Sequence, residues 1–194
     1  MKIIGITGGV GAGKSTIARA AARSLGFLYV DTGAMYRAIA LHLLRKQVIA
    51  LLGRQIIKND KTIDRKQVSD VVFGNELMRQ SLDAIIHPAV KTYILEEIRK
   101  QRQAGCRLLV IEAALLLEEH YEEFCNNVWY IHTDAEIRIR RLMDSRGYTR
   151  EKAESIIARQ GSEEFFRKHS DYVIINNGDL KTTWKQIEEG IKLL

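Results

Sequence analysis

Short apolar runs alternate along the chain with longer stretches in which apolar side chains recur every three or four residues. The runs predict strands buried on both faces, at residues 3–7, 28–30, 108–111, 128–132 and 172–175. The recurring pattern predicts helices near residues 14–25, 34–46, 66–72, 89–103, 134–145, 149–160 and 180–193. Strands that alternate with helices are typical of an α/β fold with a parallel sheet.

Two stretches are long enough to form inserts between strands, at residues 32–104 and 136–165. We expect the first to be helical, with Pro88, the only proline, opening the helix over 89–103. Both inserts follow the carboxyl ends of strands, where open α/β sheets bind ligands. We predict one domain over residues 1–194, with a core made of residues 1–31, 105–135 and 166–194.

The composition narrows the class of protein. A chain of 194 residues can bury a full core, and its net charge of +6 suits an anionic ligand. The basic residues form no dense run interleaved with aromatics, so we expect no nucleic-acid partner. No apolar run approaches the roughly 20 residues of a membrane span, and Cys106 and Cys125 lack metal-type spacing. We therefore expect a cytoplasmic protein without a membrane partner, either a monomer or a small homo-oligomer.

The first predicted strand leads directly into a glycine-rich segment with the spacing Gly8-x-x-x-x-Gly13-Lys14-Ser15. This is the phosphate-loop signature, in which backbone N–H groups and the start of a helix surround an anion. Lys14 is predicted to reach the β- and γ-phosphates, and the Ser15 hydroxyl to ligate Mg²⁺. A chance glycine-rich turn is disfavoured, because a strand is predicted before the segment and a helix after it. The other predicted nucleotide contacts in the loop are Gly9, Val10, Gly11, Ala12, Gly13 and Thr16.

Two carboxylates follow predicted strands. Glu112 follows the strand over 108–111, where it could hold Mg²⁺ or orient an acceptor hydroxyl; the alternative is a solvated charge. Asp31 follows the second strand and is a candidate general base; the alternative is that Asp31 or Thr32 merely caps the next helix. The same segment brings the Tyr36 phenol and the Arg37 guanidinium, which is suited to a forked contact with phosphate.

Arginines cluster on the predicted helix over 134–145 and just beyond it, at Arg138, Arg140, Arg141 and Arg146. We expect Arg141 and Arg146 to reach the transferred phosphate when a lid closes, although a solvated position is the alternative for any single arginine. His87 is most simply structural. The acidic run 118–123 is mostly a solvated face, with Glu118 as the expected exception because it follows three leucines.

Several segments together resemble the dephospho-CoA kinase family, and the resemblance covers nearly the whole chain. The matching segments are 6–16, 62–73, 82–90, 111–119, 138–147 and 170–180. The resemblance implies a P-loop kinase fold with a five-stranded parallel sheet, an acceptor-side insert (32–104) and a lid (136–165). It implies transfer of the ATP γ-phosphate to the 3′-hydroxyl of dephospho-CoA in coenzyme A biosynthesis. It also implies that Asn176, Asn177 and Gly178 border the adenine, that Thr7 lies near the phosphates and that residues 82–90 line the acceptor pocket. The predicted substrate contacts are Thr7, Thr32, Tyr36, Arg37, His87, Leu115 and Glu118.

The chain departs from the family at the acceptor motif. The family usually has Asp-Ala-Asp, with the second aspartate as the base, and here that position is Gly33. The segment DTGAMYRAIAL (31–41) instead resembles the acceptor motif of cytidylate kinase. Ala114 stands where proline is usual, and the spacing from Arg141 to Arg146 is one residue wider. If a base is used, Asp31 or Glu112 must supply it.

Two alternatives stay open on these residues. The first is a nucleoside monophosphate kinase of the cytidylate type, favoured by residues 31–41 alone, or a related small-molecule kinase that acts on another nucleotide. The second is a nucleotide switch without chemistry, for which Asp144-Ser145-Arg146-Gly147 has the D-x-x-G spacing. That segment follows a predicted helix rather than a strand, and the sequence contains no Asn-Lys-x-Asp motif, so the switch is disfavoured.

Overall fold

The computed structural model describes residues 1–72 and 74–194, including every side chain in these ranges except those of Leu41 and Arg65. Phe73, which ends the segment 62–73 that resembles the kinase family, lies outside the described residues. The chain forms two compact units. One comprises Met1–Asp31 with Gln101–Leu194, and the other comprises Thr32–Lys100.

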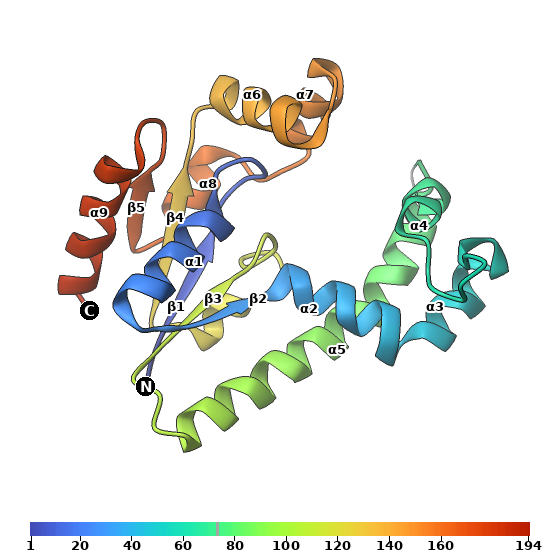
Figure 1. Cartoon of the computed structure of the whole chain (residues 1–194), viewed down its shortest axis with the longest axis horizontal. Coiled ribbons are helices and arrows are strands. Elements are labelled where there is room, and N and C mark those ends of the chain that lie inside the picture. Colours follow the sequence, from blue (N-terminus) through green and yellow to red (C-terminus); the bar gives the residue numbers. More distant parts are fainter. Residues whose placement is uncertain (73) are drawn as a thin grey trace. The chain divides into compact units, whose positions relative to one another are not determined.

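The first unit is built on one sheet of five parallel strands in the order β2-β3-β1-β4-β5 (Figure 1). The strands are β1 (Lys2–Thr7), β2 (Leu28–Asp31), β3 (Leu108–Glu112), β4 (Asn127–His132) and β5 (Tyr172–Ile175). Each predicted strand is confirmed to within one residue at either end. The central strand β1 is buried over five of its six residues, because helices cover both faces of a parallel sheet.

Six helical segments accompany this sheet in the first unit. They are α1 (Lys14–Leu25), η3 (Tyr121–Phe124), α6 (Ala135–Arg146), α7 (Arg150–Ala158), α8 (Glu163–Lys168) and α9 (Leu180–Lys192). Helices α1 and α9 contribute Ile17 and Ile187 to the core that includes Ile4 and Ile131 of the strands. Leu142 of α6 and Ala153 of α7 form a separate buried cluster with Val10 packed against it.

The second unit, Thr32–Lys100, is mainly helical in its described residues, with an isolated antiparallel bridge between Ile57 and Ile63. Its elements are α2 (Thr32–Ala38), η1 (Ile39–Leu43), α3 (Arg45–Leu52), η2 (Arg54–Ile56), α4 (Arg65–Val72) and most of α5 (Glu76–Gln103). The single helix expected over 34–46 is wrong: the segment changes to a π-helical turn at Ile39 and restarts at Arg45. The π turn ends at Leu44, whose N–H donates to the Ile39 carbonyl at 2.9 Å.

Pro88 does not open a helix, contrary to the expectation from the sequence. It lies inside α5, which begins twelve residues earlier at Glu76. The Asn75 side chain accepts a hydrogen bond from the Met78 N–H at 3.0 Å, which satisfies one of the free donors at the start of the helix. Proline removes one backbone hydrogen bond from a helix. The buried side chains spaced four apart keep α5 continuous, and they are Leu82, Ile86, Val90, Ile94 and Ile98.

No helix within residues 1–72 and 74–194 combines the length and the apolar character needed to cross a membrane.

Candidate active site at the carboxyl edge of the sheet

The phosphate loop joins β1 to α1 and requires glycine at two close approaches. Gly8 has φ of 142°, and a Cβ there would lie 2.5 Å from the Ile131 carbonyl oxygen. Gly13 has φ of 88° and precedes the first residue of α1. A Cβ on Gly13 would lie 2.5 Å from Nδ2 of Asn176. Both positions therefore combine a positive φ with backbone or amide groups that leave no space for a side chain.

Lys14 is buried within this loop, with 8% of its surface exposed. Its Nζ donates to the carbonyl oxygens of Gly8 at 2.8 Å and Gly9 at 3.1 Å. Burial lowers the pKa of Lys14 from 10.5 to about 8, and the negative charge of Glu112 partly opposes that shift. An anion bound in the loop would raise this pKa again, because a nearby negative charge favours the charged ammonium.

Ser15 and Glu112 meet beside the loop. The Ser15 hydroxyl donates to Oε1 of Glu112 at 3.0 Å, and the Tyr29 hydroxyl donates to Oε2 at 2.7 Å. Glu112 ends β3 and is only 7% exposed, so its carboxylate is held between two hydroxyl groups. Hydroxyl and carboxylate oxygens are the ligands that Mg²⁺ prefers, and the pair predicted for the metal from the sequence is therefore in contact.

Asp31 is the other carboxylate at this edge of the sheet. It ends β2, and its backbone pairs in register with Glu112. Its carboxylate lies 3.9 Å from the Arg19 guanidinium of α1, and its side chain is 25% exposed. The structure therefore places both carboxylates at the carboxyl edge of the sheet, in different surroundings.

Thr7 ends β1 at the same edge and is completely buried. Its hydroxyl oxygen has no hydrogen-bond partner among the described residues. A buried hydroxyl without a partner costs stability, so its position at the start of the phosphate loop is consistent with a bound polar ligand.

Arginines from α6 contact the loop from its other side. Arg138 donates from Nε to the Val10 carbonyl at 2.8 Å, and its Nη2 donates to the Gln160 side chain. Arg141 donates to the Gly11 carbonyl at 3.4 Å and to the Asn176 carbonyl at 2.9 Å. The arginines Arg140 and Arg146 are exposed. Arg138 and Arg141, three residues apart on one face of α6, therefore both pack on the loop. The role given to Arg146 stays a prediction.

The segment after β5 also contacts the loop. Nδ2 of Asn176 donates to the Ala12 carbonyl at 2.8 Å, and Oδ1 of Asn176 accepts from the Thr183 hydroxyl at 3.1 Å. Asn177 accepts at Oδ1 from the Asp134 N–H at 2.9 Å. These amides connect the loop to the ends of β4 and β5. The predicted contact of Asn176, Asn177 and Gly178 with adenine stays a prediction.

Leu115 and Glu118 lie in the turns that follow β3, and both are exposed. The local surroundings still raise the pKa of Glu118, chiefly through loss of water around its carboxyl group. The neighbouring Leu116 and Leu117 are buried. The buried Leu116 and Leu117 therefore anchor the turn, while Leu115 and Glu118 remain accessible to solvent.

The remaining predicted substrate residues belong to the second unit. Thr32 is buried at the start of α2, and the rings of Tyr36 and His87 meet edge to face with centroids 5.4 Å apart. His87 lies 3.4 Å from an Asp83 carboxylate oxygen. Tyr36 and Arg37 line a cavity of about 340 Å³.

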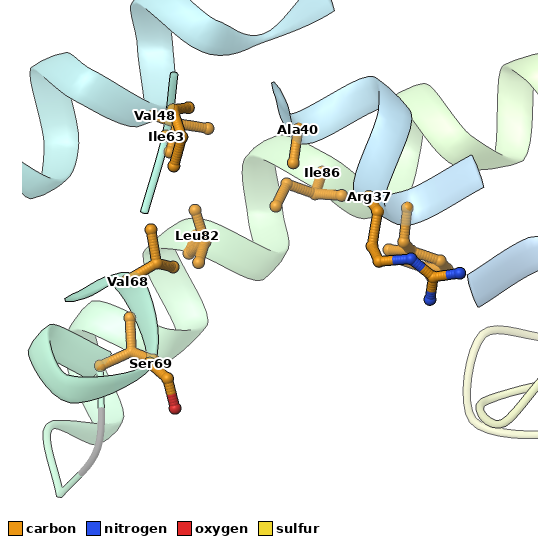
Figure 2. A pocket seen from close by; sticks show the side chains of 10 residues that line it. Arg37, Ala40, Val48, Ile63, Val68, Ser69, Leu82 and Ile86 are labelled. Atoms are coloured by element: carbon orange, nitrogen blue, oxygen red, sulfur yellow. The ribbon is translucent and has the colours of Figure 1, made fainter. Parts of the chain in front are cut away.

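This cavity is mainly apolar (Figure 2). The residues labelled in the figure come from α2, η1, α3, α4, α5 and the segment before α4, and Arg37 provides their one charged group. The side chains of Val68, Leu82 and Ile86 line it from two helices. Such a lining suits a ligand with an apolar part and an anionic part.

Several contacts of the site were not predicted from the sequence. Gln160 accepts from the Val10 N–H at 2.9 Å, and the Thr133 hydroxyl donates to the carbonyls of Ala12 and Asn176, each at 3.2 Å. Tyr29 and Arg19 stand beside the two carboxylates. Each of these contacts joins residues that are far apart in the sequence, so no local motif predicts it.

The phosphate loop, the parallel sheet and the basic side chains on the loop define a P-loop kinase. A shikimate kinase from Bacteroides thetaiotaomicron has the same fold, with a TM-score of 0.58 at 15% identity over 99% of this chain and 97% of that one. A dephospho-CoA kinase from Campylobacter jejuni is more similar, with a TM-score of 0.73 and 25% identity over 99% and 96% of the two chains. The predicted fold class is confirmed.

A family model described as dephospho-CoA kinase matches residues 2–182. The dephospho-CoA kinase of Geobacillus kaustophilus is 34% identical over 186 residues, which cover 95% of this chain and 92% of that protein. The dephospho-CoA kinase of Geobacter sulfurreducens is 33% identical over 191 residues, which cover 97% and 96% of the two. The chain belongs to the dephospho-CoA kinase family and is an ATP-dependent kinase.

Proposed function

We propose that the protein transfers the γ-phosphoryl group of ATP to the 3′-hydroxyl of dephospho-CoA. The observation that carries the proposal is the contact of Ser15 with Glu112 beside a phosphate loop, with Asp31 ending the neighbouring strand. A hydroxyl acceptor needs a carboxylate near the transferred phosphate, whereas a phosphate acceptor needs mainly cations.

The first unit supplies the groups that bind ATP. The loop N–H groups and Lys14 contact the phosphates, and Arg141 adds a second positive charge. Asn176 to Gly178 border the adenine, and residues 136–165 act as a lid whose Arg146 joins the phosphates. These assignments are supported by the contacts of Arg141 and Asn176 with the loop carbonyls.

Mg²⁺ fits the oxygen atoms of Ser15 and Glu112, which are already 3.0 Å apart. When bound, the cation neutralises charge on the phosphates. Among the described residues no group of three or more His, Cys, Asp or Glu side chains could hold a metal by itself. A site of one hydroxyl and one carboxylate therefore depends on the nucleotide for its other ligands.

Asp31 accepts the proton of the acceptor hydroxyl, and Thr7 lies near the transferred group. In the first unit we assign substrate contacts to Leu115 and Glu118. In the second unit we assign acceptor contacts to Thr32, Tyr36, Arg37 and His87. The cavity lined by Tyr36 and Arg37 supports this assignment, because its apolar wall suits the uncharged part of a long acceptor and Arg37 suits a phosphate.

The test is an ATP-consumption assay with Mg²⁺, run in parallel on dephospho-CoA and CMP. We expect turnover on dephospho-CoA, loss of that turnover in Lys14→Ala, and no turnover on CMP. Turnover on CMP alone would assign the acceptor specificity to the cytidylate-like residues 31–41 and overturn the proposal. Circular dichroism of Lys14→Ala shows whether the lost activity leaves the fold intact.

A further inference from the structure

Tyr29 contacts the Glu112 carboxylate without belonging to any predicted motif. It lies in β2 two residues before Asp31, and its hydroxyl donates to Oε2 of Glu112 at 2.7 Å. Because Ser15 donates to Oε1 of the same carboxylate, each oxygen of Glu112 carries one hydroxyl donor. The two donors restrain the carboxylate in two directions.

The strand register explains how the phenol reaches the carboxylate. Tyr29 pairs with Val110, and Glu112 lies two residues further along the same face of β3. The contact is therefore a diagonal cross-strand pair, which a long aromatic side chain can span. The ring is half-buried and packs against the buried core that includes Ile17, Ala18 and Val110. This packing restrains the ring and so fixes the position of its hydroxyl group relative to Glu112.

We propose that Tyr29 is a positioning residue for phosphoryl transfer: it holds Glu112 so that Oε1 stays beside Ser15, where the metal ion of the nucleotide complex binds. The proposal rests on the proposed function of Ser15 and Glu112 as metal ligands. In this role Tyr29 acts through its hydrogen bond to Glu112.

The test compares Tyr29→Phe with Tyr172→Phe. Tyr172 is a matched control, because its hydroxyl also donates to a protein oxygen, the Gln186 carbonyl at 2.9 Å, and it lies in β5 away from Glu112. We expect Tyr29→Phe to weaken Mn²⁺ binding in the presence of ADP by about tenfold, measured by electron paramagnetic resonance. We also expect kcat to fall by about tenfold, with the KM for ATP changed less than about twofold. Tyr172→Phe should change none of these values.

A double-mutant cycle with Glu112→Gln separates positioning from a general loss of structure. If Tyr29 acts through Glu112, adding Tyr29→Phe to Glu112→Gln should cause no further loss of Mn²⁺ affinity. Unchanged Mn²⁺ affinity in Tyr29→Phe, or an equal loss in both backgrounds, would overturn the proposal. If Tyr29→Phe does not fold, Tyr29→Leu, which also removes the hydroxyl donor, is measured in its place with the same expected losses.

The metal measurement needs no acceptor. Absence of turnover on dephospho-CoA in the wild-type protein would therefore contradict the proposed acceptor, while the Mn²⁺ affinities would still decide the role of Tyr29.

Discussion

Asp31 and Glu112 are the last residues of the neighbouring strands β2 and β3, and their backbones are paired in register. Their surroundings differ. Glu112 is 7% exposed and accepts hydrogen bonds from Ser15 and Tyr29. The Asp31 side chain is 25% exposed and has the Arg19 guanidinium 3.9 Å away. A carboxylate held by two hydroxyl groups beside the loop suits a metal ligand, and the more exposed one suits a base that meets an incoming hydroxyl.

This division of roles predicts different effects for two substitutions. Asp31→Asn should lower kcat on dephospho-CoA by roughly 100-fold or more, because it removes the proton acceptor. The affinity for ATP should stay nearly unchanged, which isothermal titration calorimetry can measure. Glu112→Gln should instead raise the Mg²⁺ concentration needed for activity. Asp144→Asn, at an exposed position of α6, is the control. Full turnover in Asp31→Asn would transfer the role of base to Glu112.

The depressed pKa of Lys14 predicts a dependence of stability on pH. Its pKa is about 8 in the folded protein and 10.5 in the unfolded chain. Between these values the unfolded state binds more protons, so the contribution of Lys14 to the unfolding free energy rises with pH. Below pH 8 both states are protonated, and the cost of burying the charge is constant.

The measurement is the difference in unfolding free energy between the wild-type protein and Lys14→Met, taken by urea denaturation at several pH values. Relative to the variant, the wild type should gain about 2–3 kcal/mol between pH 8 and pH 10.5. Lys185→Met, at an exposed position of α9, should show no such window. A difference that stays flat with pH would mean that the Lys14 pKa is not lowered in the folded protein.

The strands were predictable from the sequence because each is a short apolar run, and a parallel sheet buries such runs on both faces. The helix start at Glu76 was missed because α5 carries its buried side chains four residues apart across Pro88, and a proline normally marks the beginning of a helix. Helix α8 was missed because it has only six residues and buries one of them, Phe166. Tertiary contacts, which local patterns do not record, decide both cases.

The candidate site was predictable where chemistry follows a motif or a strand end, as for Lys14, Ser15 and Glu112. It was not predictable where a side chain acts across the fold. Thr133 and Thr183 are ordinary residues in the sequence. The pairing of β4 with β5 brings Thr133 to the Asn176 carbonyl, and Thr183 reaches the Asn176 side chain from α9. Arg138 was recognised only as part of a cluster, since nothing local distinguishes its contact with the loop from a surface position.

Arg141 and Arg140 are neighbours on α6, yet only Arg141 contacts the loop through the Gly11 and Asn176 carbonyls. Arg141→Ala should lower kcat by roughly 100-fold, because a charged donor near the transferred phosphate is lost. Arg140→Ala, at an exposed position, should leave kcat within about twofold, as expected for a surface change. Steady-state kinetics at saturating ATP distinguish the two. Equal effects, or a change in KM alone, would show that Arg141 only supports the loop.

Gly33 occupies the position of the second aspartate in the Asp-Ala-Asp acceptor motif that is usual in the dephospho-CoA kinase family. It lies near the start of α2, where an aspartate is also favoured by the positive end of the helix. Gly33→Asp should therefore fold and raise kcat/KM on dephospho-CoA by about tenfold, because it adds a second carboxylate near the acceptor.

Gly33→Asn is the matched control, since it adds nearly the same side chain without the charge. We expect it to give no gain, and we expect the gain of Gly33→Asp to survive when Asp31 is changed to Asn. A gain that disappears in the Asp31→Asn background would mean that position 33 works only through Asp31. No gain at all would mean that Asp31 and Glu112 already supply every carboxylate that the acceptor hydroxyl needs, so that the glycine limits nothing in this enzyme.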